Sequence, residues 1–402
     1  MKLHKNLCQA VVDALEEIFF EDRYADKVVQ YTLKKDKRWG SKDRAFIAEN
    51  IYDIVRWKRW IMSVSDIALE RKNLWRFLGT WLVLNEVRLP YDWKEFNQID
   101  FKKIQQKSKR LLSNRKVRES IPDWLDEMGV QELGVKIWEK ELHAQNEKAE
   151  IVLRANRLKG SVRQLQRELK QIDLQTEFIE GYDDALQLER RRNVFVTEAF
   201  KKGLFEVQDA SSQLVAPFLD LEPGMRVIDT CAGAGGKTLH IASLMKNKGK
   251  IIAMDIHEWK LGELKKRAKR NGANNIETKV IDSNKVIKRL KETADRVLID
   301  APCSGIGVLK RNPDTKWKLQ PEFIDRIKKT QEDILESYSR LVKPTGKLVY
   351  ATCSIFPSEN EKQIEKFLEK HPEFQLEDER KILAYETGYD GFYMARLKRV
   401  DS

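Results

Sequence analysis

The chain has 402 residues, of which 75 are Lys or Arg, 63 are Asp or Glu and 41% are hydrophobic, giving a formal net charge of +12. That apolar fraction supports a folded core and excludes wholesale disorder. No stretch approaches the roughly 18 uninterrupted apolar residues of a membrane span, and Asp13, Glu16 and Glu17 argue against a signal peptide. The four cysteines form no CxxC pair, which argues against a disulfide scaffold or a thiolate zinc site. We therefore expect a soluble cytoplasmic protein without a metal.

The N-terminal region carries most of the charge. Residues 1–118 hold 26 Lys and Arg against 16 Asp and Glu, which is ten of the twelve net positive charges. Such a surface suits nucleic-acid phosphates, although solvated helix faces also carry charge runs. The same region holds the tryptophans Trp39, Trp57, Trp60, Trp75, Trp81 and Trp93. Their apolar neighbours favour a place in a helical core for most of them over base stacking.

Helical spacing of apolar residues from Leu3 to about Trp138 predicts a helical domain over residues 1–140. In the segment SKDRAFIAENIYDIVRWKRWI, either Ser41 or Asp43 is a candidate helix cap. The predicted buried stripe of that helix is Phe46, Ile47, Ile51, Ile54 and Val55.

A small α/β module is predicted over residues 141–205. IVLRAN reads as a strand, SVRQLQRELKQI as a helix that begins at Ser161, and LQTEFIE as a second strand. The basic residues of this module suit either RNA contact or a solvated surface: Arg154, Arg157, Lys159 and Arg163.

Residues 206–402 alternate apolar strands with amphipathic helices, which predicts an α/β fold with a doubly wound, mostly parallel sheet. The predicted strands are RVIDT, KIIAMDI, ETKVID, RVLIDAP, KLVYATC and a closing GFYMARLKR. Polar residues follow these strands: Asp229, Thr230, Asp255, Asp282, Asp300, Cys303, Cys353 and Ser354. Ligands of open α/β sheets bind outside the carboxyl ends of the strands, so these residues indicate one site.

The turn VIDTCAGAGGKT allows a ligand to approach the backbone closely. It is no P-loop, because Cys231 stands where GxxxxGK[ST] requires glycine, and no GxGxxG fingerprint from Gly233, because Thr238 replaces the last glycine. The remaining option is the shorter loop of S-adenosylmethionine enzymes. Asp255, 20 residues after Gly235, is then placed to accept hydrogen bonds from ribose hydroxyls.

Two cysteine motifs, DAPCSG at 300–305 and ATCS at 351–354, suit methylation of cytosine carbon 5. Addition of a thiolate to carbon 6 makes carbon 5 nucleophilic enough to take a methyl group from a sulfonium. The alternative is that both cysteines are small buried hydrophobes. Their positions after two sheet strands, each before a serine, favour chemistry.

The sequence resembles the Nop/Sun (RsmB-like) RNA 5-methylcytosine methyltransferases. The motifs that carry this resemblance are FEVQDASSQLVAPFL, VIDTCAGAGGKT, AMDIHEWKL, VLIDAPCSG and YATCS. It implies that Cys353 is the nucleophile and that Cys303 assists breakdown of the covalent intermediate, with Cys303 as nucleophile the alternative. It further implies S-adenosylmethionine as cofactor, held by Ala232, Gly233, Ala234, Gly235, Gly236, Lys237, Thr238, Asp255, Asp282 and Asp300. Asp300 and Lys237 would also face the reacting centre.

Ala234 departs from the family pattern, which usually has proline there, so we expect a less rigid loop. The N-terminal segment resembles the NusB-like RNA-binding domain of RsmB-type enzymes, and the LRAN segment resembles their RRM-like module. The expected partner is RNA, with small-subunit ribosomal RNA first and transfer RNA or DNA as alternatives. A catalytically idle RNA-binding assembly factor is the competing function. We expect no membrane partner and no obligate protein partner, and hence a monomer.

Overall fold

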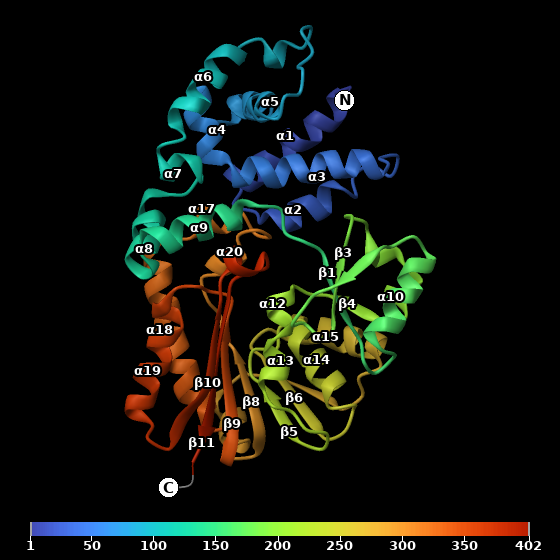
Figure 1. The fold of residues 1–402 in the computed structure, drawn as a ribbon, viewed down its shortest axis with the longest axis vertical. Coiled ribbons are helices and arrows are strands. Elements are labelled where there is room, and N and C mark those ends of the chain that lie inside the picture. Colours follow the sequence, from blue (N-terminus) through green and yellow to red (C-terminus); the bar gives the residue numbers. More distant parts are fainter. Residues whose placement is uncertain (1, 401–402) are drawn as a thin grey trace. The chain divides into compact units, whose positions relative to one another are not determined.

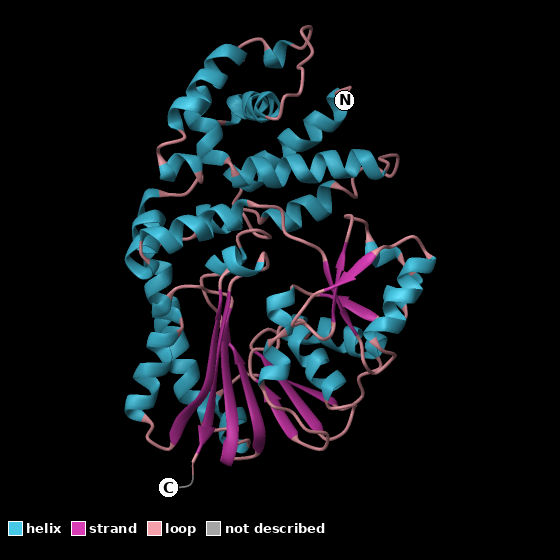
Figure 2. Cartoon of the chain, viewed as in Figure 1, coloured by secondary structure: helices cyan, strands magenta, loops and turns pink. Residues whose placement is uncertain are grey.

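The computed structural model describes residues 2–400, which form two compact units (Figures 1 and 2). The first unit extends to Glu147 and also includes Leu309–Pro321. The second comprises Lys148–Val308 and the chain from Glu322 onward. No helix in the described part of the chain is long and apolar enough to cross a membrane.

The first unit is helical, as the apolar spacing predicted. Its helices are α1 (Lys5–Phe20), α2 (Ala25–Thr32), α3 (Ser41–Arg56), α4 (Lys58–Ser65), η1 (Arg71–Asn73), α5 (Leu74–Leu84), η2 (Lys94–Phe96), α6 (Phe101–Leu111), α7 (Arg115–Arg118), α8 (Asp123–Leu133), α9 (Val135–Asn146) and α17 (Thr315–Lys318). The predicted stripe on α3 is buried except at Phe46, which is half-buried. The helix cap is Gly40 rather than Ser41 or Asp43, because the Gly40 N–H donates to the Asp43 carboxylate at 2.9 Å.

The six tryptophans from Trp39 to Trp93 are all half-buried at the margin of this helical core. The returning segment Leu309–Pro321 packs into the same unit. Trp317 donates its indole N–H to the Val55 carbonyl at 2.7 Å, and Arg56 donates to the Lys310 carbonyl at 2.9 Å. The sequence pattern instead places this segment in the predicted α/β domain of residues 206–402, because no local feature shows that it packs against the helices of the first unit.

A four-stranded antiparallel sheet in the order β2-β3-β1-β4 begins the second unit. Its elements are β1 (Val152–Ala155), α10 (Val162–Gln171), β2 (Thr176–Phe178), β3 (Ala185–Leu188), η3 (Val194–Val196), α11 (Glu198–Lys201) and β4 (Phe205–Val207). Ser161 caps α10 by accepting from the Gln164 N–H at 3.2 Å, which confirms the predicted helix start.

The basic residues of this module are mostly engaged in the structure. Arg154 is 2% exposed and donates to the Gly236 carbonyl at 2.5 Å, so its assignment to RNA or solvated surface was wrong. Arg157 pairs with Asp184, and Lys159 donates to two backbone carbonyls. Arg163 is exposed as expected.

The main sheet has seven strands in the order β10-β11-β9-β8-β5-β6-β7, which confirms the predicted α/β class. These strands are β5 (Arg226–Asp229), β6 (Lys250–Asp255), β7 (Ile276–Val280), β8 (Ala294–Asp300), β9 (Val342–Thr352), β10 (Phe374–Ile382) and β11 (Phe392–Arg399). The five strands from β9 to β7 pair in parallel, while β11 pairs antiparallel with β9 and β10.

Helices cover both faces of this sheet, as Figure 1 shows. The helical elements of this part of the chain are α12 (Ala210–Gln213), α13 (Val215–Phe218), α14 (Gly236–Leu244), α15 (Glu258–Asn271), α16 (Asn284–Arg289), η4 (Ile306–Val308), α18 (Pro321–Ser339), η5 (Pro357–Glu359), α19 (Glu361–Lys370) and α20 (Ala384–Thr387). On β5, Val227 joins the core under α14 and α15, whereas Ile228 joins the core under α18 and α19. Successive strand residues face opposite sides, so both are buried.

His240 on α14 is fully enclosed, and its Nε2 lies 2.9 Å from Asp184 Oδ2. Burial, followed by the nearby Arg154 charge, lowers the pKa of His240 to about 4. Because the unfolded chain would bind this proton near pH 6.5, it binds more protons than the folded chain between these values. Stability therefore falls as the pH drops from about 6.5 to about 4.

We expect NMR titration of the histidine rings to show one residue that remains neutral down to about pH 4. The variant His240→Gln should remove that resonance and so assign it. A His240 ring that titrates near pH 6.5 would contradict the buried, neutral state.

Candidate active site

The carboxyl ends of the parallel strands meet at one edge of the main sheet. Asp229, Asp255 and Asp300 are the last residues of β5, β6 and β8. Register pairs Asp229 with Ala253 on β6, and Asp300 with Ala351 on β9. The predicted polar residues that follow these strands are therefore brought to this edge by the parallel pairing.

The glycine-rich turn links β5 to α14. Gly235 adopts a left-handed conformation at φ +86°, and a Cβ there would lie 2.5 Å from Leu264 Cγ, so only glycine fits. At Gly233, φ is +53° and an added Cβ would meet no atom within 4 Å, so there is open space next to this residue of the turn. Arg267 donates to the Ala234 carbonyl at 2.8 Å, which supports the turn where the family has proline.

Asp255 is 6% exposed and accepts from the backbone N–H of Gly233 at 2.9 Å and of His257 at 2.8 Å. A carboxylate offers about four acceptor positions, so two remain for a ligand hydroxyl. Asp282 is exposed beyond β7, where it accepts from the Ser283 hydroxyl at 3.0 Å.

Asp229 is 1% exposed, and its Oδ2 accepts from the Thr238 hydroxyl at 2.7 Å. Burial raises the pKa of Asp229 to about 7. Its other carboxylate oxygen makes no hydrogen bond to any described residue. A buried, unpaired acceptor beside an open glycine turn fits a ligand that carries a hydrogen-bond donor.

Lys237, at the start of α14, pairs with Asp300 at the end of β8. Lys237 Nζ lies 2.6 Å from Asp300 Oδ2 and 5.0 Å from the centre of the Phe392 ring. The Lys237 side chain is only 12% exposed, while that of Asp300 is 29% exposed. The pair thus places an amine and a carboxylate in direct contact at the strand edge.

Cys303 and Cys353 come together although 50 residues separate them. Their sulfur atoms lie 3.2 Å apart, and both residues are half-buried. The pKa of Cys303 is raised well above its usual value, chiefly by its hydrogen bond with Cys353 and then by burial. Neither cysteine is therefore an isolated packing residue, in contrast to Cys8, which is 0% exposed in the helical core.

Sequence reasoning missed the residue that holds both cysteine loops. Glu359 is 0% exposed and binds Ser304 and Ser354, the residues that follow the two cysteines. The only available signal was its place six residues after Cys353, which by itself suggests nothing about its partners.

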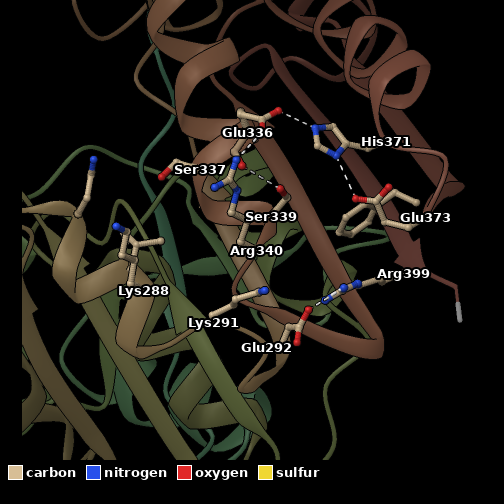
Figure 3. A pocket seen from close by; sticks show the side chains of 13 residues that line it. Lys288, Lys291, Glu292, Glu336, Ser337, Ser339, Arg340, His371, Glu373 and Arg399 are labelled. Atoms are coloured by element: carbon tan, nitrogen blue, oxygen red, sulfur yellow. Dashed lines mark hydrogen bonds and ion pairs between the residues drawn. The ribbon is translucent and has the colours of Figure 1, made fainter. Parts of the chain in front are cut away.

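A separate hollow of about 530 Å³ lies elsewhere on the second unit (Figure 3). Its lining residues include Glu292 and Arg340, which precede the amino ends of β8 and β9. There His371 bridges Glu336 and Glu373 at 2.6 and 3.0 Å, as the dashed lines in Figure 3 show. This hollow contains none of the predicted site residues.

The parallel sheet, the glycine turn and the acid that ends the next strand define a Rossmann-like methyltransferase that uses S-adenosylmethionine. Family models of the 16S rRNA methyltransferase RsmB/F and of the RsmF/B-like ferredoxin-like domain match residues 216–398 and 121–195. The chain belongs to the RsmB/F methyltransferase family, which confirms the resemblance.

Similar proteins extend over both units. The probable ribosomal RNA small subunit methyltransferase B of Synechocystis sp. is 30% identical, covering 96% of this chain and 97% of its own. The probable enzyme of the same name from Bacillus subtilis is 33% identical over 70% of this chain and 66% of its own. The crystal structure of the protein PH0851 aligns with 99% of this chain and 100% of its own, at 27% identity and a TM-score of 0.84.

Replacing Asp255 with alanine should weaken S-adenosylmethionine binding about tenfold to a hundredfold, because hydrogen bonds to a charged group contribute about 1.5–3 kcal/mol. Titration calorimetry measures this directly. Glu263→Gln is the matched control, since Glu263 forms only a surface pair with Lys266 on α15. Equal affinities of the wild type and of Asp255→Ala for S-adenosylmethionine would show that Asp255 does not bind the cofactor.

Proposed function

We propose that this chain forms 5-methylcytidine in small-subunit ribosomal RNA through a covalent adduct between Cys353 and carbon 6 of the target cytosine. The observation that carries this proposal is the 3.2 Å approach of two sulfur atoms at the ends of neighbouring parallel strands. The names of the Synechocystis and Bacillus relatives support the ribosomal substrate.

The Cys353 thiolate adds to carbon 6, and the electron pair of the 5,6 double bond becomes available at carbon 5. S-adenosylmethionine supplies the electrophilic methyl group that carbon 5 takes. S-adenosylhomocysteine would leave after the transfer. A base then takes the proton from carbon 5, and the electron pair of that C–H bond restores the 5,6 double bond as the bond between carbon 6 and Cys353 Sγ breaks. Cys353 leaves as the thiolate that began the reaction.

The proton balance between the two thiols favours Cys353 as nucleophile. The pKa of Cys303 is raised, chiefly by its hydrogen bond with Cys353 and then by burial, and in our proposal Cys303 donates that hydrogen bond to Cys353 Sγ. A donated hydrogen bond stabilises a thiolate at the acceptor sulfur. Cys303 then remains protonated beside the adduct, where it can assist release of Cys353. The reverse assignment would make the group with the raised pKa the attacking anion.

We propose that Lys237 and Asp300 also face the reacting centre. In our proposal Asp300 accepts a hydrogen bond from the cytosine edge, and Lys237 orients that carboxylate by binding its Oδ2. Residues 232–238 and Asp255 would hold the cofactor, with Asp282 beside its adenine. Asp229 lies beneath them, since its buried carboxylate is held by Thr238.

The basic first unit supports a large RNA substrate, because residues 1–118 carry ten of the twelve net charges. Phosphate contacts carry no sequence information, so the same chemistry on transfer RNA is the second candidate. A catalytically idle assembly factor is disfavoured, since it has no need of two adjacent thiols. We further propose that the enzyme acts as a monomer without an obligate protein partner.

Replacing Cys353 and replacing Cys303 should block the reaction at different steps. Cys353→Ala should abolish turnover and leave no covalent complex, because no thiolate can reach carbon 6. Cys303→Ala should accumulate enzyme linked to RNA, because the adduct forms but resolves slowly. Denaturing gel electrophoresis with labelled RNA and S-adenosylmethionine distinguishes them. Trapping by Cys353→Ala instead would reverse the two assignments.

Bisulfite sequencing of RNA from cells that lack this protein tests the substrate. We expect one cytidine of small-subunit ribosomal RNA to lose methylation, and reintroduced wild-type protein to restore it where Cys353→Ala does not. A change confined to transfer RNA would favour the second candidate. No change in either pool would contradict the proposed reaction.

A further inference from the structure

A buried carboxylate joins the two cysteine loops. Glu359 lies in η5, six residues after Cys353, and is 0% exposed. Its Oε2 accepts from the Ser304 backbone N–H at 2.8 Å and from Gln331 Nε2 at 3.2 Å. Its Oε1 accepts from the hydroxyls of Ser304 and Ser354, at 2.5 and 2.6 Å.

These four hydrogen bonds fill the acceptor positions of a carboxylate. No cation pairs with Glu359 among the residues that the structure describes, so neutral donors alone hold it. Because no oxygen lone pair remains free, Glu359 has no group to offer a substrate or a cofactor. Its influence on the reaction must therefore pass through the residues that it binds.

Those residues adjoin the reacting sulfurs. Ser304 follows Cys303 directly, and Ser354 follows Cys353 directly. The Ser304 backbone N–H is the most constraining donor, because it fixes the peptide that begins at Cys303. Gln331 links Glu359 to the residue before Cys303, since the same side-chain amide also donates to the Pro302 carbonyl at 2.9 Å. The carboxylate thus restrains both loops at the residue next to each sulfur.

The position of η5 is itself fixed by the strand that carries Cys353. The Tyr350 hydroxyl donates to the Glu359 carbonyl at 2.8 Å, and the Asn360 amide donates to the Ser354 carbonyl at 2.9 Å. Two further hydrogen bonds join the loops: the Ser304 hydroxyl donates to the Ser354 hydroxyl at 3.3 Å, longer than its 2.5 Å bond to Glu359, and the Gly307 N–H donates to the Cys353 carbonyl at 2.9 Å. Side-chain restraint of Ser304 therefore comes chiefly from Glu359.

We propose that Glu359 is a positioning residue that sets the approach of Cys303 and Cys353 by binding the serine after each one. The effect of Glu359 on catalysis rests on the proposed function, whereas the bridge between the two loops does not. A bridge of this kind requires a side chain of glutamate length with two acceptor atoms. It does not require the negative charge, because serine hydroxyls can turn to accept as well as donate.

The test compares three variants in the full-length protein by two readouts. The first readout is the rate at which diamide joins Cys303 to Cys353 in the absence of RNA. Each thiol loses one proton and one electron as the sulfur–sulfur bond forms, and the azo group is reduced to the hydrazine. The second readout is kcat and KM for methylation of RNA. The variants are Glu359→Asp, Glu359→Gln and the control Glu361→Gln, whose parent residue pairs with Lys381 instead.

Glu359→Asp should slow disulfide formation and lower kcat about tenfold to a hundredfold, with KM for RNA nearly unchanged, because its carboxylate is one methylene short of the serines. Glu359→Gln should restore both rates to within about threefold, because the amide spans the same gap. Glu361→Gln should match wild type. Wild-type disulfide formation in Glu359→Asp would overturn the proposal, as would a Glu359→Gln variant as slow as Glu359→Asp.

If Glu359→Asp does not fold, as judged by circular dichroism, Ser354→Ala carries the same test, since it removes one anchor and keeps the carboxylate. Slower disulfide formation would support the bridge, and the wild-type rate would overturn it. A wild-type enzyme that fails to methylate cytosine would refute the proposed function alone, because the diamide readout needs neither RNA nor cofactor.

Discussion

The parallel pairing of β8 with β9 is the constraint on which the site depends. Neighbouring strands of a sheet lie about 4.8 Å apart, so residues that follow paired strand ends become neighbours whatever their separation in sequence. Register between Asp300 and Ala351 sets Cys303 and Cys353 beside each other. The two sulfur atoms lie 3.2 Å apart there.

The meeting of the loops after these strands at one edge of the sheet also explains why polar side chains are buried near the site. Loops that converge on one edge of a sheet bury polar groups, and each buried group needs a partner. Glu359 accepts from four donors at once, and Arg154 donates to the Gly236 carbonyl, at the start of the α14 helix that follows the glycine-rich turn. Asp229 keeps one oxygen unpaired at the site itself. A buried acceptor at the site is thereby available to a ligand that carries a hydrogen-bond donor.

Much of the architecture was predictable because strands covered on both faces are long apolar runs. RVIDT, KIIAMDI and RVLIDAP were recognised for that reason, as was the Ser161 cap. The edge strand β10 was missed, since FQLEDERKI is mostly charged and its side chains are largely exposed. Arg154 was misassigned because β1 is buried along its whole length, so the alternation that marks a half-exposed strand is absent.

The sequence by itself determined the order of the elements and indicated the candidate site residues. Glycine at 235 is dictated by the local backbone, and acids or thiols after strands can be seen without coordinates. Only the tertiary structure decided which of these groups touch. Glu359 reaches Ser304 across 55 residues of chain, and residues 309–321 leave the catalytic unit to pack with the helical one. Such contacts depend on how distant segments pack, which no local pattern records, because local preferences act over only a few residues.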